Sequence, residues 1–211
     1  AVVGGPWMKA VFGLDRGFGY YDDSKISSVN GRLAYDISTA AVRWIQAHKD
    51  DPFFLFLNYY DPHTPYDPPE IFVERYVPCE LLQDRSRKAE LKNALYDAEI
   101  AYMDQHLGKV FTSLEDLGID EKTWIIVTAD HGEYFMERGR VFRNRDVYDE
   151  LIHVPLLISG AIDAGYAGQV VAEPVETRSI PATVMALAGV DRTGEHTSEL
   201  QSSIKTVCRP L

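Results

Sequence analysis

Short apolar runs alternate with amphipathic helical segments along this 211-residue chain, and this alternation constrains the fold more than any other feature. The apolar runs are PFFLFLN (52–58), TWIIVTA (123–129), VPLLIS (154–159) and a weaker QVVAEPV (169–175). Continuous runs of this length are typical of strands buried on both faces. Apolar residues recur at helical spacing over 33–48, 86–117 and 180–187. The pattern predicts an α/β fold with a sheet covered by helices on both faces.

The longest helical segment, Ser86 to Leu117, ends before Gly118. Its buried stripe is expected at positions in steps of four and three, namely Tyr96, Ile100, Met103, Leu107, Val110, Leu114 and Leu117. The proline-rich residues 59–85 predict a long loop, and loops of that length in compact domains are usually functional or disordered. GLDRGFGYYDD (13–23) predicts a turn-rich loop, and Asn30 and Gly31 are expected to cap the helix that follows.

Composition narrows the possible partners. The formal net charge of −11 disfavours nucleic acid, because an acidic chain repels phosphate backbones. No apolar run reaches the 18 or more residues of a membrane span. Cys79 and Cys208 form no CxxC pair, and Cys79 is expected to be a packed small residue rather than a nucleophile.

Polar residues follow two of the predicted strands where each strand ends. His63 lies in YYDPHTPYDPP (59–69), after the first run, and Asp130 and His131 open DHGE (130–133), after the second. Ligands of open α/β sheets bind beyond the carboxyl ends of the strands, so these side chains are expected to face one crevice. A carboxylate beside an imidazole suits a divalent metal, and Gly132 would let backbone approach closely.

Each of these residues also has a purely structural interpretation. Asp130 could be the N-cap of a helix with His131 in a satisfied polar pocket, and His63 could be an exposed loop residue. Four arginines follow DHGE and could either hold an oxyanion or form a solvated charged loop: Arg138, Arg140, Arg143 and Arg145.

Several motifs in order resemble the sulfatases of the alkaline phosphatase superfamily. They are GLDRGFGYYDD, PFFLFLNYYDPHTPY, YDAEIAYMDQHLGKV, WIIVTADHGE, YDELIHVPLLI and RSIPATVMALAGV. The resemblance implies an alkaline-phosphatase-like mixed sheet sandwiched between helices. It also implies hydrolysis of small-molecule or glycan sulfate monoesters at a divalent metal, usually calcium, with manganese or zinc as alternatives.

The resemblance also implies residue roles. Asp130 and His131 resemble two of the metal ligands, and His63 resembles the histidine that contacts the sulfate ester. The family often has a histidine eight residues after the metal-binding aspartate and a lysine thirteen after it, where this chain has Arg138 and Arg143. Arginine does not donate a proton at ordinary pH but binds sulfate oxygens, so Arg143 is expected to hold the sulfate opposite His63.

The family's Cys/Ser-x-Pro-Ser/Ala-Arg motif, which supplies the formylglycine nucleophile, does not occur in this sequence. Residues 1–191 are therefore expected to be the C-terminal portion of a sulfatase catalytic domain, incomplete at the N-terminus and inactive alone. Residues 192–211 resemble a translated sequencing adapter and are expected to be non-native or disordered, unless they are a polar loop. Three hypotheses remain: a sulfuric ester hydrolase, a phosphorus-ester hydrolase or phosphoethanolamine-type transferase of the same superfamily, and a non-catalytic fragment.

Overall fold

The computed structural model describes residues 1–137, 139, 146–161 and 167–190. The chain divides into two compact units, one formed by Ala1–Asp120 with His131–His153 and the other by Glu121–Asp130 with the described residues from Val154 onward. Some of the sequence predictions concern residues outside this described part: Arg138, Arg140, Arg143, Arg145 and residues 192–211.

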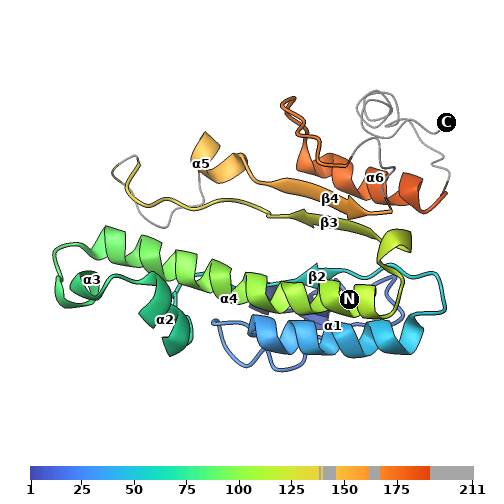
Figure 1. Ribbon diagram of the computed structural model, residues 1–211, viewed down its shortest axis with the longest axis horizontal. Helices are drawn as coiled ribbons and strands as arrows, with labels where there is room; N and C mark the ends of the chain where they lie inside the picture. Colours follow the sequence, from blue (N-terminus) through green and yellow to red (C-terminus); the bar gives the residue numbers. More distant parts are fainter. Residues whose placement is uncertain (138, 140–145, 162–166, 191–211) are drawn as a thin grey trace. The chain divides into compact units, whose positions relative to one another are not determined.

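The first unit is built around two helices that pack against each other, α1 (Ala34–His48) and α4 (Lys88–Asp116) (Figure 1). They confirm the helices predicted at 33–48 and 86–117. The core here consists of Ala34, Phe72, Val77, Leu81, Ala94, Ala98 and Tyr102. A second cluster of buried residues comprises Ala1, Val3 and Ile26.

The buried face of α4 differs from the predicted stripe. It runs through Ala98, Tyr102 and His106, and of the predicted positions only Val110 and Leu114 are buried. Small residues allow close helix packing, so the face that contains Ala98 points inward while the larger predicted residues lie half-buried beside it.

The predicted long loop at 59–85 is wrong in its second half, where α2 (Glu70–Tyr76) and α3 (Cys79–Gln83) form and pack on α4. Pro69 and Pro78 stand immediately before these helices. Proline favours a helix start because its φ is already fixed, so prolines that indicated a loop in fact begin two helices. Cys79 is exposed, and the prediction that it is packed is also wrong.

Two short strands of the first unit, β1 (Val2–Val3) and β2 (Leu57–Asn58), pair in parallel with Val2 opposite Leu57. The strand predicted at 52–58 is therefore paired with β1 over its last two residues, Leu57 and Asn58. The prediction that this run is buried on both faces is wrong for the described residues, since Phe54 is 57% exposed.

The second unit contains an antiparallel pair, β3 (Trp124–Thr128) and β4 (Leu156–Gly160), in which Ile126 lies opposite Ile158. Both strands form where 123–129 and 154–159 predicted them, but the prediction that they are buried on both faces is wrong for the described residues, since Leu157 is 57% exposed. The helix α6 (Ile180–Leu187) confirms the last predicted helix. The weaker strand predicted at 169–175 does not form, and Val170 is 94% exposed.

The remaining short elements are η1 (Pro6–Met8), η2 (Ala10–Phe12), η3 (Asp120–Lys122), α5 (Asp149–Ile152) and η4 (Thr177–Ser179). Among the helices of the described residues, none combines the length and the apolarity of a membrane span.

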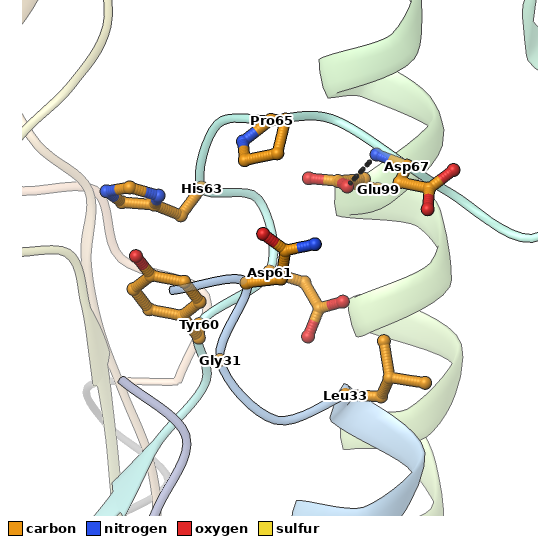
Figure 2. Close-up of a pocket in the computed structure, with 9 residues that line it drawn as sticks. Gly31, Leu33, Tyr60, Asp61, His63, Pro65, Asp67 and Glu99 are labelled. Atoms are coloured by element: carbon orange, nitrogen blue, oxygen red, sulfur yellow. Dashed lines mark hydrogen bonds between the residues drawn. The ribbon is translucent and has the colours of Figure 1, made fainter. Parts of the chain in front are cut away.

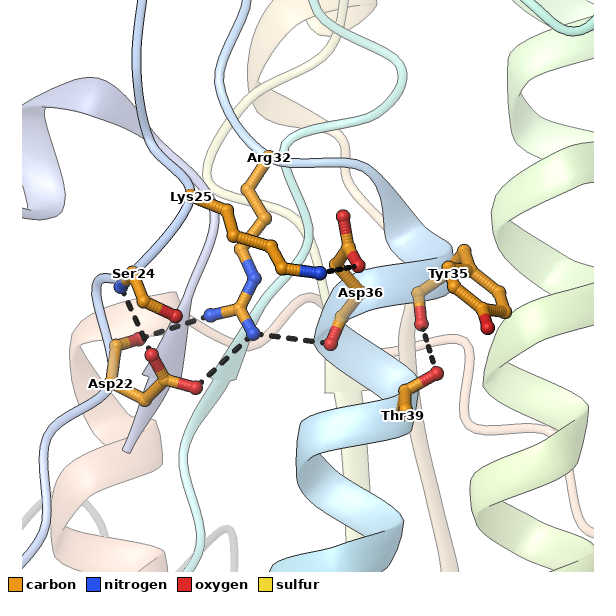
Figure 3. Close-up of polar contacts among 7 residues, drawn as sticks. All are labelled: Asp22, Ser24, Lys25, Arg32, Tyr35, Asp36 and Thr39. Atoms are coloured by element: carbon orange, nitrogen blue, oxygen red, sulfur yellow. Dashed lines mark hydrogen bonds and ion pairs between the residues drawn. The ribbon is translucent and has the colours of Figure 1, made fainter.

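A buried ion pair fixes the chain where α1 begins (Figure 3). Arg32 is 4% exposed, its Nη2 lies 3.1 Å from Asp22 Oδ2, and it also donates to the Asp36 carbonyl oxygen at 3.1 Å. Burial acts to raise the pKa of Asp22, but hydrogen bonds from Ser24 and Arg32 outweigh it and lower that pKa. Asp22 thus ties the turn-rich loop predicted at 13–23, which the structure confirms, to the start of α1.

Candidate active site

His63 lies in the loop that follows β2, and its ring is held by its neighbours in the chain. The ring stacks on Tyr60 with the centroids 4.3 Å apart and the planes at 18°. Nδ1 lies 2.6 Å from the Thr64 carbonyl oxygen, and because a carbonyl only accepts, Nδ1 is the donor. In the neutral ring the lone pair is then on Nε2. His63 is an exposed loop residue, as one interpretation expected, but its ring is oriented by these two contacts.

A cavity of about 130 Å³ opens beside His63 (Figure 2). Its lining comprises Asn30, Gly31, Leu33, Tyr60, Asp61, His63, Pro65, Asp67 and Glu99. Three of these residues are acidic, and no lysine or arginine is among them. We call the part of the cavity formed by Asp61, Asp67 and Glu99 the acidic pocket.

Asp61 has a structural task as well as a place in the acidic pocket. Its Oδ2 accepts a hydrogen bond at 2.9 Å from the backbone N–H of Ala34, the first residue of α1. The prediction that Asn30 and Gly31 cap this helix is wrong, because Leu33 is the N-cap and the side-chain cap comes from Asp61. Burial raises the pKa of Asp61 to about 6, although the hydrogen bond from Ala34 acts to lower it.

Glu99 reaches the same cavity from α4 and was missed by the sequence analysis. It is 5% exposed, and its Oε1 accepts a hydrogen bond at 2.7 Å from the backbone N–H of Asp67. Within the described part of the chain, its buried Oε2 has no hydrogen-bond partner. Burial, more than the negative charges of Asp61 and Asp67, raises the pKa of Glu99 to about 8. No local sequence pattern indicated it, because Glu99 lies outside the apolar stripe that was predicted for this helix.

Asp130 and His131 follow β3 closely in the sequence. Residues 131–134 are not helical, so the interpretation of Asp130 as a helix N-cap is wrong. Asp130 is exposed and His131 is half-buried. His131 Nδ1 lies 2.7 Å from the Gly132 carbonyl oxygen, so Nδ1 carries the proton and the lone pair of the neutral ring is on Nε2.

Gly132 confirms the expected close approach of two backbone segments. Its N–H donates to the Leu151 carbonyl oxygen of α5 at 2.8 Å. A Cβ atom at this position would lie 2.1 Å from the Glu150 carbonyl oxygen, which is far inside van der Waals contact. Only glycine fits here, and this contact fixes the backbone directly after His131.

The loop that contains His63 is joined to the segment after His131. Tyr66 donates a hydrogen bond from its hydroxyl to Glu133 Oε2 at 3.2 Å, and its ring lies against those of Tyr96 and Phe135. Burial first, and then the negative charge of Glu133, raise the pKa of Tyr66, so the hydroxyl keeps its proton and remains the donor. Two segments separated by more than sixty residues are thereby side by side in the first unit.

The structure does not test the complete set of predicted site residues. Arg143 lies outside the described residues, and the roles of His63, Asp130 and His131 stay predictions. In the part of the chain that is described, no group of three or more His, Cys, Asp or Glu residues is arranged to hold a metal ion.

Comparison with solved structures defines the class of fold. The chain matches a Bacteroides fragilis protein described as a candidate sulfatase, yidJ, with a TM-score of 0.67 and 18% identity over 83% of this chain and 41% of that chain. It matches the Bacteroides thetaiotaomicron protein BT33494S-sulf with a TM-score of 0.60 and 24% identity over 81% and 36% of the two chains. The predicted alkaline-phosphatase-like α/β class is confirmed.

Sequence comparison then identifies the family. The sequence model of the sulfatase family matches residues 7–190, so the chain belongs to the sulfatase family. The uncharacterized sulfatase YidJ of Escherichia coli K12 is 27% identical over 185 residues, which cover 75% of this chain and 36% of that protein. Arylsulfatase K of Danio rerio is 40% identical over 108 residues, which cover 50% and 20%. The chain thus spans about a third of the first relative and a fifth of the second.

Proposed function

We propose that this chain contributes His63, Asp130 and His131 to an active site that hydrolyses sulfate monoesters at a divalent metal ion. Membership of the sulfatase family supports this proposal. The hydrogen bond from Tyr66 to Glu133 is the structural observation that supports it most, because it joins the loop containing His63 to the segment that begins with His131.

The chemistry of the donor atoms at Asp130 and His131 suits a divalent metal. Asp130 offers exposed carboxylate oxygens, and His131 offers Nε2 while its Nδ1–H is engaged by a backbone carbonyl, as is usual for metal-binding histidines. We propose calcium, the ion that the family resemblance implies, with manganese or zinc as alternatives. A divalent ion held there would stabilise the negative charge on the sulfate oxygens.

His63 and Arg143 are the proposed contacts to the ester itself. His63 Nε2 can donate to a sulfate oxygen when the ring is protonated and can accept a proton when it is neutral. The guanidinium of Arg143 matches the geometry of an oxyanion. The formylglycine nucleophile that the resemblance implies belongs to a motif that this sequence does not contain, so the test below uses a protein that carries both that motif and this chain.

The proposed substrates are sulfate esters of small molecules or glycans. The structural relative Ps i-CgsB, which matches with a TM-score of 0.59, has been solved in complex with k-i-k-neocarrahexaose. The exposed position of His63 is compatible with a substrate whose alcohol part extends beyond the site.

The test compares hydrolysis of 4-nitrophenyl sulfate and 4-nitrophenyl phosphate by the same protein. We expect the higher kcat/KM for the sulfate ester, and His63→Ala should lower it by about a hundredfold or more. His153→Ala, at an exposed histidine after α5, is the matched control and should leave kcat/KM unchanged. A preference for the phosphate ester would favour a phosphorus-ester hydrolase instead, and an active His63→Ala variant would remove His63 from the site.

A further inference from the structure

The acidic pocket contains a carboxylate oxygen that nothing in the described chain satisfies. Glu99 is 5% exposed, and while Oε1 binds the Asp67 N–H, Oε2 is buried without a partner. A buried polar atom left unpaired is costly, and proteins keep few of them. Figure 2 shows the Glu99 carboxylate directed from α4 into the cavity, on the side opposite His63. A hydrogen-bond donor from outside the chain would satisfy it.

The charge of the cavity indicates which donor fits best. Asp61 and Asp67 stand beside Glu99, and among the residues that the structure describes no lysine or arginine lines the cavity to balance them. A second anionic group on the substrate would be repelled here, whereas a cation would offset the desolvation of the carboxylates. Burial raises the pKa values of Asp61 and Glu99. A hydroxyl group can donate one hydrogen bond but supplies no such charge.

The volume and position of the cavity limit the size of the group. A volume of about 130 Å³ leaves room for an ammonium group with its neighbouring carbon atoms. His63 lines the same cavity as Glu99. If His63 contacts the sulfate ester, the amine lies only a few bonds from the ester oxygen.

We propose that the acidic pocket binds a protonated primary amine on the alcohol part of the substrate, so that the protein takes sulfate esters of amino sugars or amino alcohols. This proposal rests on the proposed function for the ester but assigns the pocket through Glu99 and Asp61. Glu99 releases its proton to solvent when the ammonium binds and accepts the ammonium through Oε2, and Asp61 supplies a second negative charge while it caps α1.

The test is a binding measurement that needs no turnover. D-glucosamine, D-glucose and N-acetyl-D-glucosamine are titrated into the full chain, and dissociation constants are measured from NMR chemical shifts. D-glucosamine should bind at least about tenfold more tightly than the two neutral sugars, since hydrogen bonds to charged groups are the stronger ones. Equal binding of D-glucose would show that the pocket recognises a hydroxyl group and would overturn the proposal.

Two variants assign the binding to the pocket. Glu99→Gln keeps the acceptor for the Asp67 N–H, and Asp61→Asn keeps an acceptor for the Ala34 N–H, so both preserve the hydrogen bonds that hold the fold. Each should weaken D-glucosamine binding about tenfold. Glu115→Gln removes a charge from an exposed site on α4 and should change nothing. Wild-type affinity in both pocket variants would refute the proposal.

The result of the D-glucosamine binding test can be distinguished from the result of the sulfate hydrolysis test. If D-glucosamine binds as expected but 4-nitrophenyl sulfate is not hydrolysed, the pocket assignment stands and the proposed function fails. If the ester is hydrolysed but D-glucosamine does not bind, the proposed function stands and the amine-binding pocket is refuted.

Discussion

A methyl group at Gly132 would collide with the backbone of Glu150, and the resulting loss in the free energy of unfolding can be estimated. The added Cβ would lie 2.1 Å from the Glu150 carbonyl oxygen, whereas carbon–oxygen contacts normally exceed about 3.3 Å. One of the two backbone segments must therefore move by about 1 Å, which breaks the 2.8 Å hydrogen bond to Leu151. Overpacking costs about 1–3 kcal/mol and the lost bond about 1 kcal/mol, so Gly132→Ala should lower the free energy of unfolding by about 2–4 kcal/mol.

The assay is urea unfolding of the wild type, Gly132→Ala and a control, Gly108→Ala. Gly108 lies inside α4, and a Cβ there meets no atom within 4 Å. Alanine should therefore raise stability at Gly108 by about 0.5–1 kcal/mol, because it loses less backbone entropy on folding. The two substitutions are chemically the same and should have opposite signs. If Gly132→Ala were as stable as the wild type, the close approach of Gly132 to the backbone of Glu150 would be refuted.

Two further predictions concern buried charge. Asp22→Asn leaves the guanidinium of Arg32 without its counter-ion and should cost about 3 kcal/mol or more in urea unfolding, whereas Lys49→Met, at an exposed pair, should be neutral within about 0.5 kcal/mol. Because the pKa of Asp22 is lowered by folding, its contribution is present above the unfolded pKa and lost as pH falls through the folded one. Glu99 acts in the opposite sense: its pKa of about 8 means that the folded state keeps a proton that the unfolded chain loses above about pH 4.5. Stability should therefore fall as pH rises between these values, and an equally steep profile in Glu99→Gln would contradict the raised pKa.

Local periodicity predicted the long elements well because their patterns are repeated over many residues. The helices at α1, α4 and α6 and the strands β3 and β4 all form where apolar spacing indicated them. The errors arise where packing against distant parts of the chain decides the secondary structure. The 52–58 run pairs with β1 over two residues, and 169–175 forms no strand although several of its residues are apolar. Proline gave a misleading indication at α2 and α3, where it begins a helix instead of breaking one.

The same contrast between local patterns and long-range packing separates the residues of the candidate site. His63, Asp130 and Gly132 could be singled out because their motifs are local in sequence. Glu99 could not, because its importance depends on a long-range contact with Asp67 and on burial. The cap of α1 by Asp61 is equally invisible to spacing rules, since the two partners are 27 positions apart.

The central claim is that Asp130 and His131 bind the metal ion on which sulfate-ester hydrolysis depends. The most direct measurement is the rate of 4-nitrophenyl sulfate hydrolysis as a function of calcium concentration, in a protein that carries both the nucleophile motif and this chain. Asp130→Asn should raise the half-maximal calcium concentration by about tenfold or more, because even outer partners of metal ligands contribute that much. Asp116→Asn, at the exposed end of α4, should follow the wild-type curve. The same calcium dependence in Asp130→Asn as in the wild type would contradict the claim.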